Sequence, residues 1–485
     1  MITLEPGEPG PLYLQIATRL RAAIATGTLN AGARLPSART LSAQLGVARG
    51  TVDAAYDLLA GEGAIEPRGA AGTVIAAQMH GLTRAPAQPA LGLARPRPLL
   101  SATPLPFQRG LPALDAFPRK LWAALTAKAA RAMGEADLGY PDMCGAMALR
   151  AEIAAYLGLA RGVVRAPHQI MITPGYQGAL TLARQVLLRA GDAVWVEDPG
   201  HPQASQALEV GGASLVPVPV DADGMRVAAG IAAAPRAKLA VVTPTHQSPL
   251  GVSLSLPRRL ALLAWAEEAR AWVLEDDYDS EFRYTGPAPP SLKSLDRGDR
   301  VLFAGSFSKT LFPGLRLGYL VVPDALAEAM TRAARLTTRG PPLLEQHVTA
   351  AFMAGGHFAR HVKRMRGLYA RRRAALAEAL SGHFPVELAA GGMHLLIRLP
   401  EGVPGNMPGN MPGNMPGNMP GNMPGNMNDG LIARRALAAG LAPMGLSGLS
   451  IARNAGQGLL LGFTNVREED AKALVARLVA VVEGG

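Results

Sequence analysis

The stretch Ser306-Phe307-Ser308-Lys309-Thr310 follows an apolar run, Val301–Phe303, and Arg316 comes seven residues after its lysine. The chain has 48 basic residues, of which seven are lysines. Where arginine is the usual cation, a lysine at such a place suggests a need for an amine, because a guanidinium stays protonated and forms no Schiff base. Lysine forms one once its surroundings lower its pKa. Considered alone, Lys309 is more simply explained as a solvated loop lysine, so the surrounding pattern has to decide.

Short apolar strands alternate with helical segments from about residue 109 onward. The predicted strands are Ala193–Val196, Leu239–Val242, Trp272–Leu274, Val301–Phe303 and Tyr319–Val322. This alternation predicts an α/β fold, in which helices cover both faces of a largely parallel sheet and a smaller α+β part follows at the C-terminus. Ligands bind at the carboxyl ends of such strands, and both Lys309 and Asp276 come just after a predicted strand.

The polar residues after these strands fit the needs of pyridoxal phosphate. Lys309 supplies the amine, and Asp276 supplies an acid beside the ring nitrogen, so that the protonated ring can act as an electron sink. Gly175-Tyr176-Gln177 opens a predicted helix, whose backbone N–H groups and positive end suit a phosphate. Ser306 and Arg316 add a hydroxyl and a bidentate cation. Each feature is weak alone, but together they are specific.

Residues 11–79 carry the pattern of a winged helix-turn-helix domain. Ser37 is a good N-cap for a short helix through Leu45, Gly46 ends that helix, and a second helix runs from about Ala48 to about Gly61. Two short strands, 64–69 and 72–75, follow as the wing. Before them, apolar residues recur at helical spacing: Tyr13, Ile16, Leu20 and Ile24.

Two segments are predicted to lie outside the folded domains. Residues 80–108 hold six prolines and little periodicity, which predicts an extended linker before a large domain at 109–485. Residues 404–427 are six tandem Pro-Gly-Asn-Met repeats, which cannot bury a face and exclude helix and central strand. We interpret them as a disordered insertion in a surface loop, between a strand at His394–Leu399 and a helix near Ile432–Ala439.

Composition indicates the class of protein. At 485 residues the chain is expected to hold two or three domains. It has no run of eighteen apolar residues, and residues 1–6 lack the features of a secretory signal. The single cysteine, Cys144, excludes an intramolecular disulfide framework. We therefore expect a cytoplasmic protein, and we predict no metal site.

The net charge of +11 is unevenly spread along the chain. Residues 1–79 hold six arginines and six acidic residues and are neutral, whereas Arg332–Arg373 holds ten basic residues and one acidic residue, Glu345. The simpler interpretation of this basic stretch is a solvated helix face. The alternative is a second DNA-facing surface that bends a long operator.

The order of these parts resembles the MocR/GabR family of transcriptional regulators that bind pyridoxal phosphate. Residues 110–485 are similar to fold-type I aminotransferases, and residues 11–79 are similar to a GntR-type winged helix. The resemblance covers nearly the whole chain except the linker and the repeats. It is carried by the motifs Leu35-Pro36-Ser37-Ala38-Arg39, Ala48-Arg49-Gly50-Thr51-Val52, Val242–Gly251, Glu275–Tyr284 and Gly305–Tyr319.

The resemblance implies roles for the residues that match the family's motifs. Lys309 forms the Schiff base with the cofactor, Asp276 pairs with its ring nitrogen, and Tyr278 donates to its phenolic oxygen. Tyr140 reaches the phosphate of the opposite subunit, because fold-type I sites are built at a dimer interface. The residues that hold the phosphate within the subunit are Tyr176, Gln177, Ser306 and Arg316.

The sequence departs from the family's pattern at two positions. His201 stands where the family usually has a tyrosine stacked on the cofactor ring, which changes the polarity of the site. The arginine that binds the substrate carboxylate is expected before Gly458–Phe463, where Arg453 is the candidate. If Arg453 points elsewhere, the cofactor itself could be the signal. His246 and Gln247 stand where aminotransferases contact the cofactor.

Four of the six arginines in the N-terminal domain lie where the two helices or the wing would meet DNA. Arg49 begins the second helix, and we predict that it reads a base edge. The other predicted DNA-binding residues, expected mainly at the phosphate backbone, are Arg34, Ser37, Arg39, Thr51 and Arg68.

Together these observations predict a homodimeric transcriptional regulator that binds a double-stranded DNA operator. It would sense pyridoxal phosphate, or an amine or amino acid that the cofactor captures. Binding at the large domain would bias the placement of two DNA-binding heads through the linker. An active aminotransferase with an accessory DNA-binding head is the alternative, since the same cofactor residues serve both functions.

Overall fold

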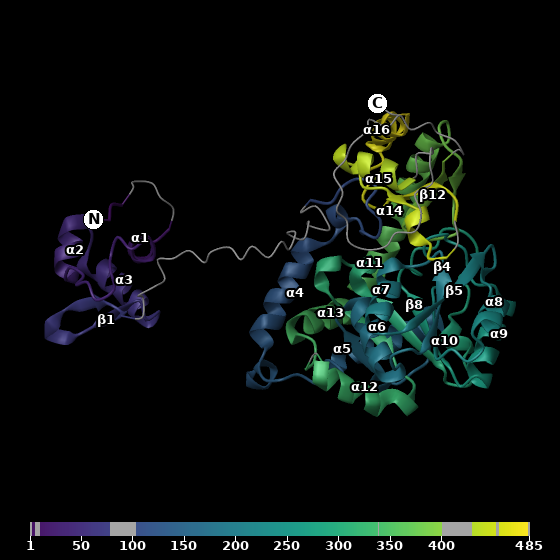
Figure 1. Cartoon of the computed structure of the whole chain (residues 1–485), viewed down its shortest axis with the longest axis horizontal. Helices are drawn as coiled ribbons and strands as arrows, with labels where there is room; N and C mark the ends of the chain where they lie inside the picture. Colours follow the sequence, from purple (N-terminus) through teal and green to yellow (C-terminus); the bar gives the residue numbers. More distant parts are fainter. Residues whose placement is uncertain are drawn as a thin grey trace. The chain divides into compact units, whose positions relative to one another are not determined.

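The computed structural model describes residues 2–4, 10–77, 103–337, 339–399, 429–452 and 455–483. They belong to two compact units, Met1–Leu99 and Leu100–Gly485, whose division falls within the predicted linker (Figure 1). The repeats at 404–427, Arg453 and most of the predicted linker lie outside the described residues. Within these described ranges, no helix is both long and apolar enough to cross a membrane.

The N-terminal unit contains the predicted helix-turn-helix and wing. The Ser37 Oγ caps α2 by accepting a hydrogen bond from the Thr40 N–H at 3.1 Å, and Gly46 follows the helix with φ 67°. The two wing strands pair antiparallel. The elements are α1 (Leu12–Ala25), α2 (Ala38–Leu45), α3 (Arg49–Gly61), β1 (Ile65–Pro67) and β2 (Thr73–Ile75).

The core of this unit forms where the apolar faces of its helices meet. Ile16 and Leu20 of α1 are buried in one cluster with Val52 of α3. The Tyr56 hydroxyl, also on α3, donates to the Pro36 carbonyl at 2.8 Å. Because Pro36 directly precedes the cap of α2, this bond helps to fix how α2 and α3 cross.

The large unit is built on an eight-stranded sheet in the order β3-β10-β9-β8-β7-β4-β5-β6. The five strands from β9 to β5 in that order are parallel, as predicted, whereas β10 is antiparallel to both of its neighbours. The bounds are β3 (Ile170–Thr173), β4 (Ala193–Asp198), β5 (Ser214–Asp221), β6 (Gly224–Met225), β7 (Leu239–Val242), β8 (Trp272–Asp277), β9 (Val301–Ser306) and β10 (Gly318–Val321).

Three of these strands are longer than the sequence predicted, and β4 extends two residues beyond its expected end. β8 and β9 each extend three residues beyond the expected end, because the ladder between them continues through Asp276, which pairs with Ala304. The prediction that Asp276 follows its strand was therefore wrong. Asp276 is instead held by the sheet itself, which fixes its direction more tightly than a loop would.

Helices cover both faces of the large sheet, as predicted. Alternate residues of β7 show this, since Leu239 and Val241 belong to one apolar cluster and Ala240 and Val242 to another. One face carries α6 (Gly175–Leu187), α7 (Pro202–Val210) and α12 (Asp324–Thr337). The other carries α5 (Met147–Arg161), α8 (Val227–Ala233), α9 (Leu256–Glu268) and α13 (Leu343–Ala354).

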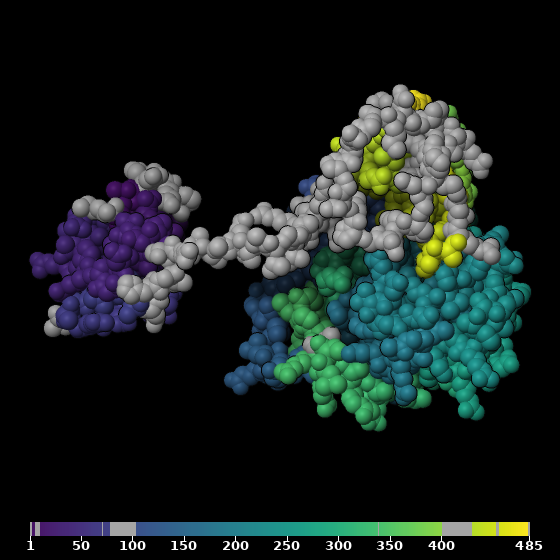
Figure 2. Space-filling view, in the orientation of Figure 1, coloured from purple at the N-terminus to yellow at the C-terminus, as the bar shows by residue number. Residues whose placement is uncertain are grey.

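Short or peripheral helices complete the large unit. The blue segment containing α4 (Arg119–Ala132) lies against the green segment containing α13 on the face shown in Figure 2. Two one-turn helices, α10 (Leu292–Leu295) and α11 (Phe307–Thr310), flank β9 along the chain.

The C-terminal part adds a four-stranded antiparallel sheet in the order β11-β12-β14-β13, as the predicted α+β part required. Its core includes Tyr369, Ile397 and Leu461. The elements are α14 (His357–Leu380), β11 (Val386–Glu387), β12 (His394–Arg398), α15 (Asp429–Ala438), β13 (Met444–Gly445), β14 (Gly458–Gly462) and α16 (Ala471–Glu483). The last helices of this part, α15 and α16, form the yellow end of the chain in Figure 1.

Candidate cofactor site

Lys309 lies on a one-turn helix at the carboxyl end of the central strand β9. The strand ends at Ser306, whose Oγ accepts a hydrogen bond from the Ser308 N–H at 3.2 Å and so starts α11. The Lys309 Nζ donates to the Gly110 carbonyl at 2.8 Å. Burial and then the charge of Arg109 lower the pKa of Lys309 to about 8. This leaves an unprotonated fraction near neutral pH, as Schiff-base chemistry requires.

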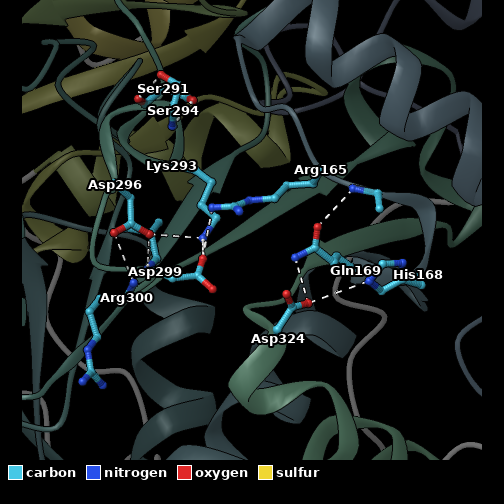
Figure 3. Close-up of polar contacts among 12 residues, drawn as sticks. Arg165, His168, Gln169, Ser291, Lys293, Ser294, Asp296, Asp299, Arg300 and Asp324 are labelled. Atoms are coloured by element: carbon cyan, nitrogen blue, oxygen red, sulfur yellow. Dashed lines mark hydrogen bonds and ion pairs between the residues drawn. The ribbon is translucent and has the colours of Figure 1, made fainter.

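Lys293, which is fully buried, shows what a structural lysine looks like in this fold. Lys293 precedes β9 in the chain, whereas Lys309 follows that strand. The Lys293 side chain points between two acidic residues, Asp296 and Asp299 (Figure 3). Its Nζ donates to Asp296 at 3.1 Å and to Asp299 at 2.7 Å, and Arg165 also reaches Asp299. Lys309 has no carboxylate partner within the described part of the chain. Its amine is therefore available for chemistry in a way that the Lys293 amine is not.

Asp276 is buried near Lys309 and carries an unpaired oxygen. Its Oδ1 is buried and has no hydrogen-bond partner among the described residues. Burial raises the pKa of Asp276 well above its usual range, Asp277 and Asp279 raise it further, and Lys309 opposes them. Leaving such an oxygen unpaired is costly. The position fits a cationic N–H such as a protonated pyridine nitrogen.

The start of α6 and Arg316 form a candidate phosphate cradle. Arg316 donates from Nη2 to the Pro174 carbonyl at 3.2 Å and is otherwise exposed. Gly175 has φ 72°, and a Cβ there would lie 3.6 Å from the Arg316 guanidinium. The backbone N–H groups of this thirteen-residue helix and the guanidinium thus lie together, as an anion requires.

His201 stands beside Tyr176, and both predicted cofactor residues are partly buried. Their rings are stacked, with centroids 6.1 Å apart and planes at 26°. Burial, with the charges of Arg109 and Lys309, lowers the pKa of His201 to about 4. The imidazole is therefore neutral near pH 7, and its Nδ1 is buried without a hydrogen-bond partner among the described residues. A neutral ring suits stacking against an aromatic cofactor.

The residues after β7 and β8 do not all serve the site as predicted. The Tyr278 hydroxyl lies 3.0 Å from the His246 Nδ1, which also contacts the carboxylate of Asp279 at 3.1 Å. Gln247 is almost wholly buried, and its Nε2 donates to the Pro199 carbonyl at 2.8 Å. Its Oε1 accepts from the Leu250 N–H at 3.0 Å. Gln247 thus joins two loops, and we withdraw it as a cofactor contact.

Two further site residues escaped the sequence prediction. Arg109 donates from Nη1 to the Ser248 Oγ at 3.1 Å, and its charge acts on Lys309 and on His201. Asp198 accepts hydrogen bonds from the backbone N–H groups of Ile451 and Ala452 at 2.8 and 3.0 Å. These two hydrogen bonds hold the backbone just before Arg453 at the end of β4, which is Asp198. The only available signal for Arg109 was its place beside Gly110, where the aminotransferase-like region begins.

Tyr140 remains a prediction as a contact to a partner subunit. Its side chain is 81% exposed, and the Arg339 guanidinium lies over its ring at 5.8 Å. Among the described residues, no contact is present between Tyr140 and Lys309 of the same subunit. The placement is compatible with a reach across a dimer interface.

The predicted DNA-binding residues of the N-terminal unit are mostly exposed. Arg49 begins α3, with 71% of its side chain exposed, and pairs with Asp53 at 3.4 Å. Arg34 runs beside the wing, where a Cβ on Gly72 would meet its Nε at 2.7 Å. Arg68 pairs with Glu66 at 3.0 Å in the wing. Ser37 and Arg39 are exposed at the start of α2, and Thr51 is partly buried on α3.

The basic stretch Arg332–Arg373 is only partly available to a ligand. Arg372 is buried and pairs with Asp115 at 2.6 Å, and Arg373 lies over the Tyr284 ring at 5.0 Å. Arg371 pairs with Glu468 at 3.1 Å. Several of these cations thus stabilise the packing of α14, which weakens the hypothesis of a second DNA surface.

Comparison with known proteins identifies both units. Residues 12–75 match the family of bacterial regulatory proteins called gntR, and residues 112–403 match aminotransferase class I and II. The chain is 38% identical over 82% of its length to a probable rhizopine catabolism regulatory protein, MocR, of Rhizobium meliloti, covering 84% of that protein. It is 35% identical over 82% of its length to the pyridoxine biosynthesis transcriptional regulator PdxR of Corynebacterium glutamicum, covering 85% of it.

The solved structures agree on the fold of the large unit. A kynurenine aminotransferase of Pyrococcus horikoshii superposes with a TM-score of 0.67 at 28% identity. The match covers 79% of this chain and 91% of the archaeal chain. The sheet that carries Lys309 and Asp276 therefore has the architecture of an aminotransferase.

Proposed function

Because the chain belongs to the MocR/GabR family of transcriptional regulators, in which a GntR-type winged helix precedes an aminotransferase-like domain, we propose that it binds pyridoxal phosphate at Lys309. The single observation that carries this proposal is that a lysine without an acid partner and a buried acid with an unpaired oxygen lie in one site. Lys309 is a lysine with a lowered pKa and no acid partner among the described residues, and Asp276 offers a buried, unpaired oxygen. One planar cofactor would satisfy both groups.

The other residues of the site would hold the remaining parts of the cofactor. Gly175, Ser306 and Arg316 would bind the phosphate, while the neutral His201 ring would stack on the cofactor ring. When bound, pyridoxal phosphate supplies an electrophilic carbon that exchanges amines, and a ring that accepts electron density. Tyr278 would turn its hydroxyl from His246 toward the cofactor's phenolic oxygen.

We propose that this chemistry serves to sense a ligand and that its role is not to make a product. Cofactor or amine bound in the large unit would bias how two N-terminal units meet an operator, through the residues that join them. We propose that the active form is a homodimer in the cytoplasm, in which Tyr140 completes the phosphate site of the partner subunit. Arg49 and its exposed neighbours would contact the DNA.

An absorbance spectrum of the purified full-length protein tests the proposal. We expect a near-visible band after addition of pyridoxal phosphate, and borohydride should remove it by reducing the link to Lys309. The band should be altered or absent in Lys309→Ala and unchanged in Lys238→Ala, a control at an exposed lysine. Peptide mapping after reduction should find the modified lysine at position 309. The absence of a band in the wild-type protein would reject the proposal.

An active aminotransferase is the second candidate, and one observation favours it. The chain is 31% identical to a 2-aminoadipate transaminase of Thermus thermophilus, over 63% of this chain and 79% of that enzyme. A steady-state assay with a panel of amino donors and keto acids separates the two functions. We expect at most slow single turnover, and robust multiple turnover would overturn the purely regulatory function.

A further inference from the structure

One ring nitrogen of His246 lies between two oxygen groups. Its Nδ1 is 3.0 Å from the Tyr278 hydroxyl and 3.1 Å from the carboxylate of Asp279. A ring nitrogen either carries a proton and donates, or has a lone pair and accepts. It therefore cannot accept a hydrogen bond from Tyr278 while it donates one to Asp279. The position of this single proton decides in which direction the Tyr278 hydroxyl points its own hydrogen.

Asp279 favours the arrangement in which Nδ1 of His246 carries the proton. The Asp279 side chain is 1% exposed, and both of its carboxylate oxygens lie within hydrogen-bond distance of Nδ1, at 3.1 and 3.2 Å. Among the described residues, Nδ1 is the donor available to this carboxylate. An ionised carboxylate only accepts hydrogen bonds, so a lone pair on Nδ1 would leave it buried without a donor, which is costly.

Two other buried histidines of the large unit carry their proton on the opposite nitrogen. The Nε2 of His394 lies 3.0 Å from the Pro249 carbonyl, and the Nε2 of His361 lies 2.9 Å from the Thr310 carbonyl. A carbonyl only accepts, so each Nε2 carries a proton. Burial lowers the pKa of His394 to about 3 and that of His361 to about 4, so both rings are neutral near pH 7. His246 differs because its Nδ1 is the nitrogen that meets an acceptor.

The other nitrogen of His246 faces a small cavity. Its Nε2 is buried and has no hydrogen-bond partner among the described residues. A Cβ on Gly251 or on Gly392 would lie 3.2 or 2.4 Å from this nitrogen, so the two glycines bound the space before it. Both line a cavity of about 10 Å³, together with Ser253 and Ser280. This volume is about the smallest that holds one water, which can donate to Nε2 when Nδ1 carries the ring proton.

We propose that Asp279 holds the ring proton of His246 on Nδ1 and thereby keeps the hydroxyl hydrogen of Tyr278 free to donate to the phenolic oxygen of the cofactor. The Tyr278 oxygen would accept from Nδ1, and one water in the cavity would donate to Nε2. Asp279 and His246 act through Tyr278, so both are positioning residues. The inference rests on the proposed cofactor function in its last step, whereas the position of the proton is a property of the cofactor-free protein.

Ring ¹⁵N NMR of the full-length, cofactor-free protein labelled at histidine shows where the proton lies. We expect a pyrrole-type shift for Nδ1 of His246 and for Nε2 of His394, which is the internal reference for the opposite tautomer. His246→Gln identifies the His246 signals. Asp279→Asn should give His246 a pyridine-type Nδ1 and leave the His394 signals in place, which also shows that the variant is folded.

The NMR result has two outcomes that would overturn the proposal. A pyridine-type Nδ1 in the wild-type protein would place the proton on Nε2, and this measurement needs no variant of Asp279. A pyrrole-type Nδ1 that persists in Asp279→Asn would show that the carboxylate does not hold the proton.

A pH titration of the near-visible band of the cofactor-loaded protein tests the consequence for Tyr278. A hydrogen bond from Tyr278 stabilises negative charge on the phenolic oxygen, so Tyr278→Phe should raise the pKa of the band by about one unit. The charge of Asp279 raises the pKa of Lys309, so in the Tyr278→Phe background Asp279→Asn should lower the pKa of the band. When Tyr278 is present, loss of its donated bond should offset this lowering by about one unit.

The comparison of the two backgrounds separates positioning from charge. The groups that face His246 are Tyr278, Asp279 and Arg283, which follow β8, and His394 on β12, on which the charges of Arg109 and Lys309 act. Arg109, Arg283 and His394 are present in all four proteins, so their contributions cancel. Equal lowering in both backgrounds would show that Asp279 acts by its charge alone and would overturn its positioning role. Failure of the wild-type protein to form any band would reject the cofactor function and the role of Tyr278, while the NMR shifts would still decide the position of the proton.

Discussion

The two units present their predicted functional side chains in opposite ways. In the N-terminal unit these residues fall within residues 34–68, and Arg49 is 71% exposed beside Asp53. In the large unit, Asp276 lies on β8 and Lys309 lies on the one-turn helix that follows β9, and the two meet in a largely buried site where their charges perturb one another. A surface site can be assembled from local rules at little cost in stability. A buried reactive site contains polar groups without partners, and these groups destabilise the protein until a ligand binds.

Among the variants that test this difference, we expect the largest effect from Asp276→Asn. We expect the affinity for pyridoxal phosphate to fall at least about 100-fold, because a charge-assisted bond to the ring nitrogen is lost. The cofactor-free protein should instead become more stable than the wild type, since a buried carboxylate has been removed. Cofactor titration followed by absorbance measures the first effect, and thermal unfolding followed by tryptophan fluorescence measures the second.

The stability gain of Asp276→Asn should depend on pH in a defined direction. The folded-state pKa of Asp276 is raised, so above the unfolded value of 3.8 the native wild type binds more protons than the unfolded chain. Wild-type stability from this group therefore falls as pH rises from 3.8 toward the folded pKa. The variant should match the wild type near pH 4 and exceed it at pH 7. A variant that is less stable at pH 7 would show that Asp276 is satisfied in the cofactor-free protein.

The same contrast explains what the sequence could predict. Ser37 and Gly46 follow local rules for starting and ending a helix, and the structure confirms both. Lys309 was found because a strand end implies a ligand position. Gln247 was misassigned and Arg109 was missed, because their partners are distant: Gln247 bonds to Pro199, 48 residues away, and Arg109 bonds to Ser248, 139 residues away. Such contacts depend on how loops pack together at the ends of the strands, and a short sequence pattern does not predict that packing.

Arg49→Ala tests whether the exposed surface reads sequence. We expect a loss of about 1–3 kcal/mol in specific operator binding, with little change in binding to unrelated DNA, because a base contact is lost. Arg39→Ala should weaken all sequences alike and reduce the slope of affinity against salt. Fluorescence anisotropy with operator and scrambled DNA at several salt concentrations measures both. Equal losses for Arg49→Ala on the two DNAs would place Arg49 at the phosphate backbone.

Ser37→Ala tests the local rule itself. The variant loses the side-chain acceptor for the Thr40 N–H, which should cost the N-terminal unit about 1 kcal/mol. Hydrogen exchange of α2 and α3 peptides in the full-length protein measures the loss, while peptides of the large sheet serve as the internal control. Ser37→Asp should restore most of the protection, because an aspartate also caps. Loss of protection in both variants would point to a role for Ser37 beyond capping.

Glu62→Gln gives the smallest effect and the sharpest contrast with Asp276. Glu62 pairs with Arg21 at 2.7 Å on the surface of the N-terminal unit, and that hydrogen bond lowers its pKa. A lowered folded pKa means stability that is present above the unfolded value of 4.5 and is lost as pH falls through the folded pKa. Glu62→Gln should therefore slightly reduce hydrogen-exchange protection of α1 and α3 at pH 7, and this reduction should shrink as the pH falls through the folded pKa. Asp276→Asn stabilises at pH 7 by the same linkage with the opposite sign. If both variants changed stability in the same direction as pH rises, the distinction between a satisfied surface acid and an unsatisfied buried one would fail.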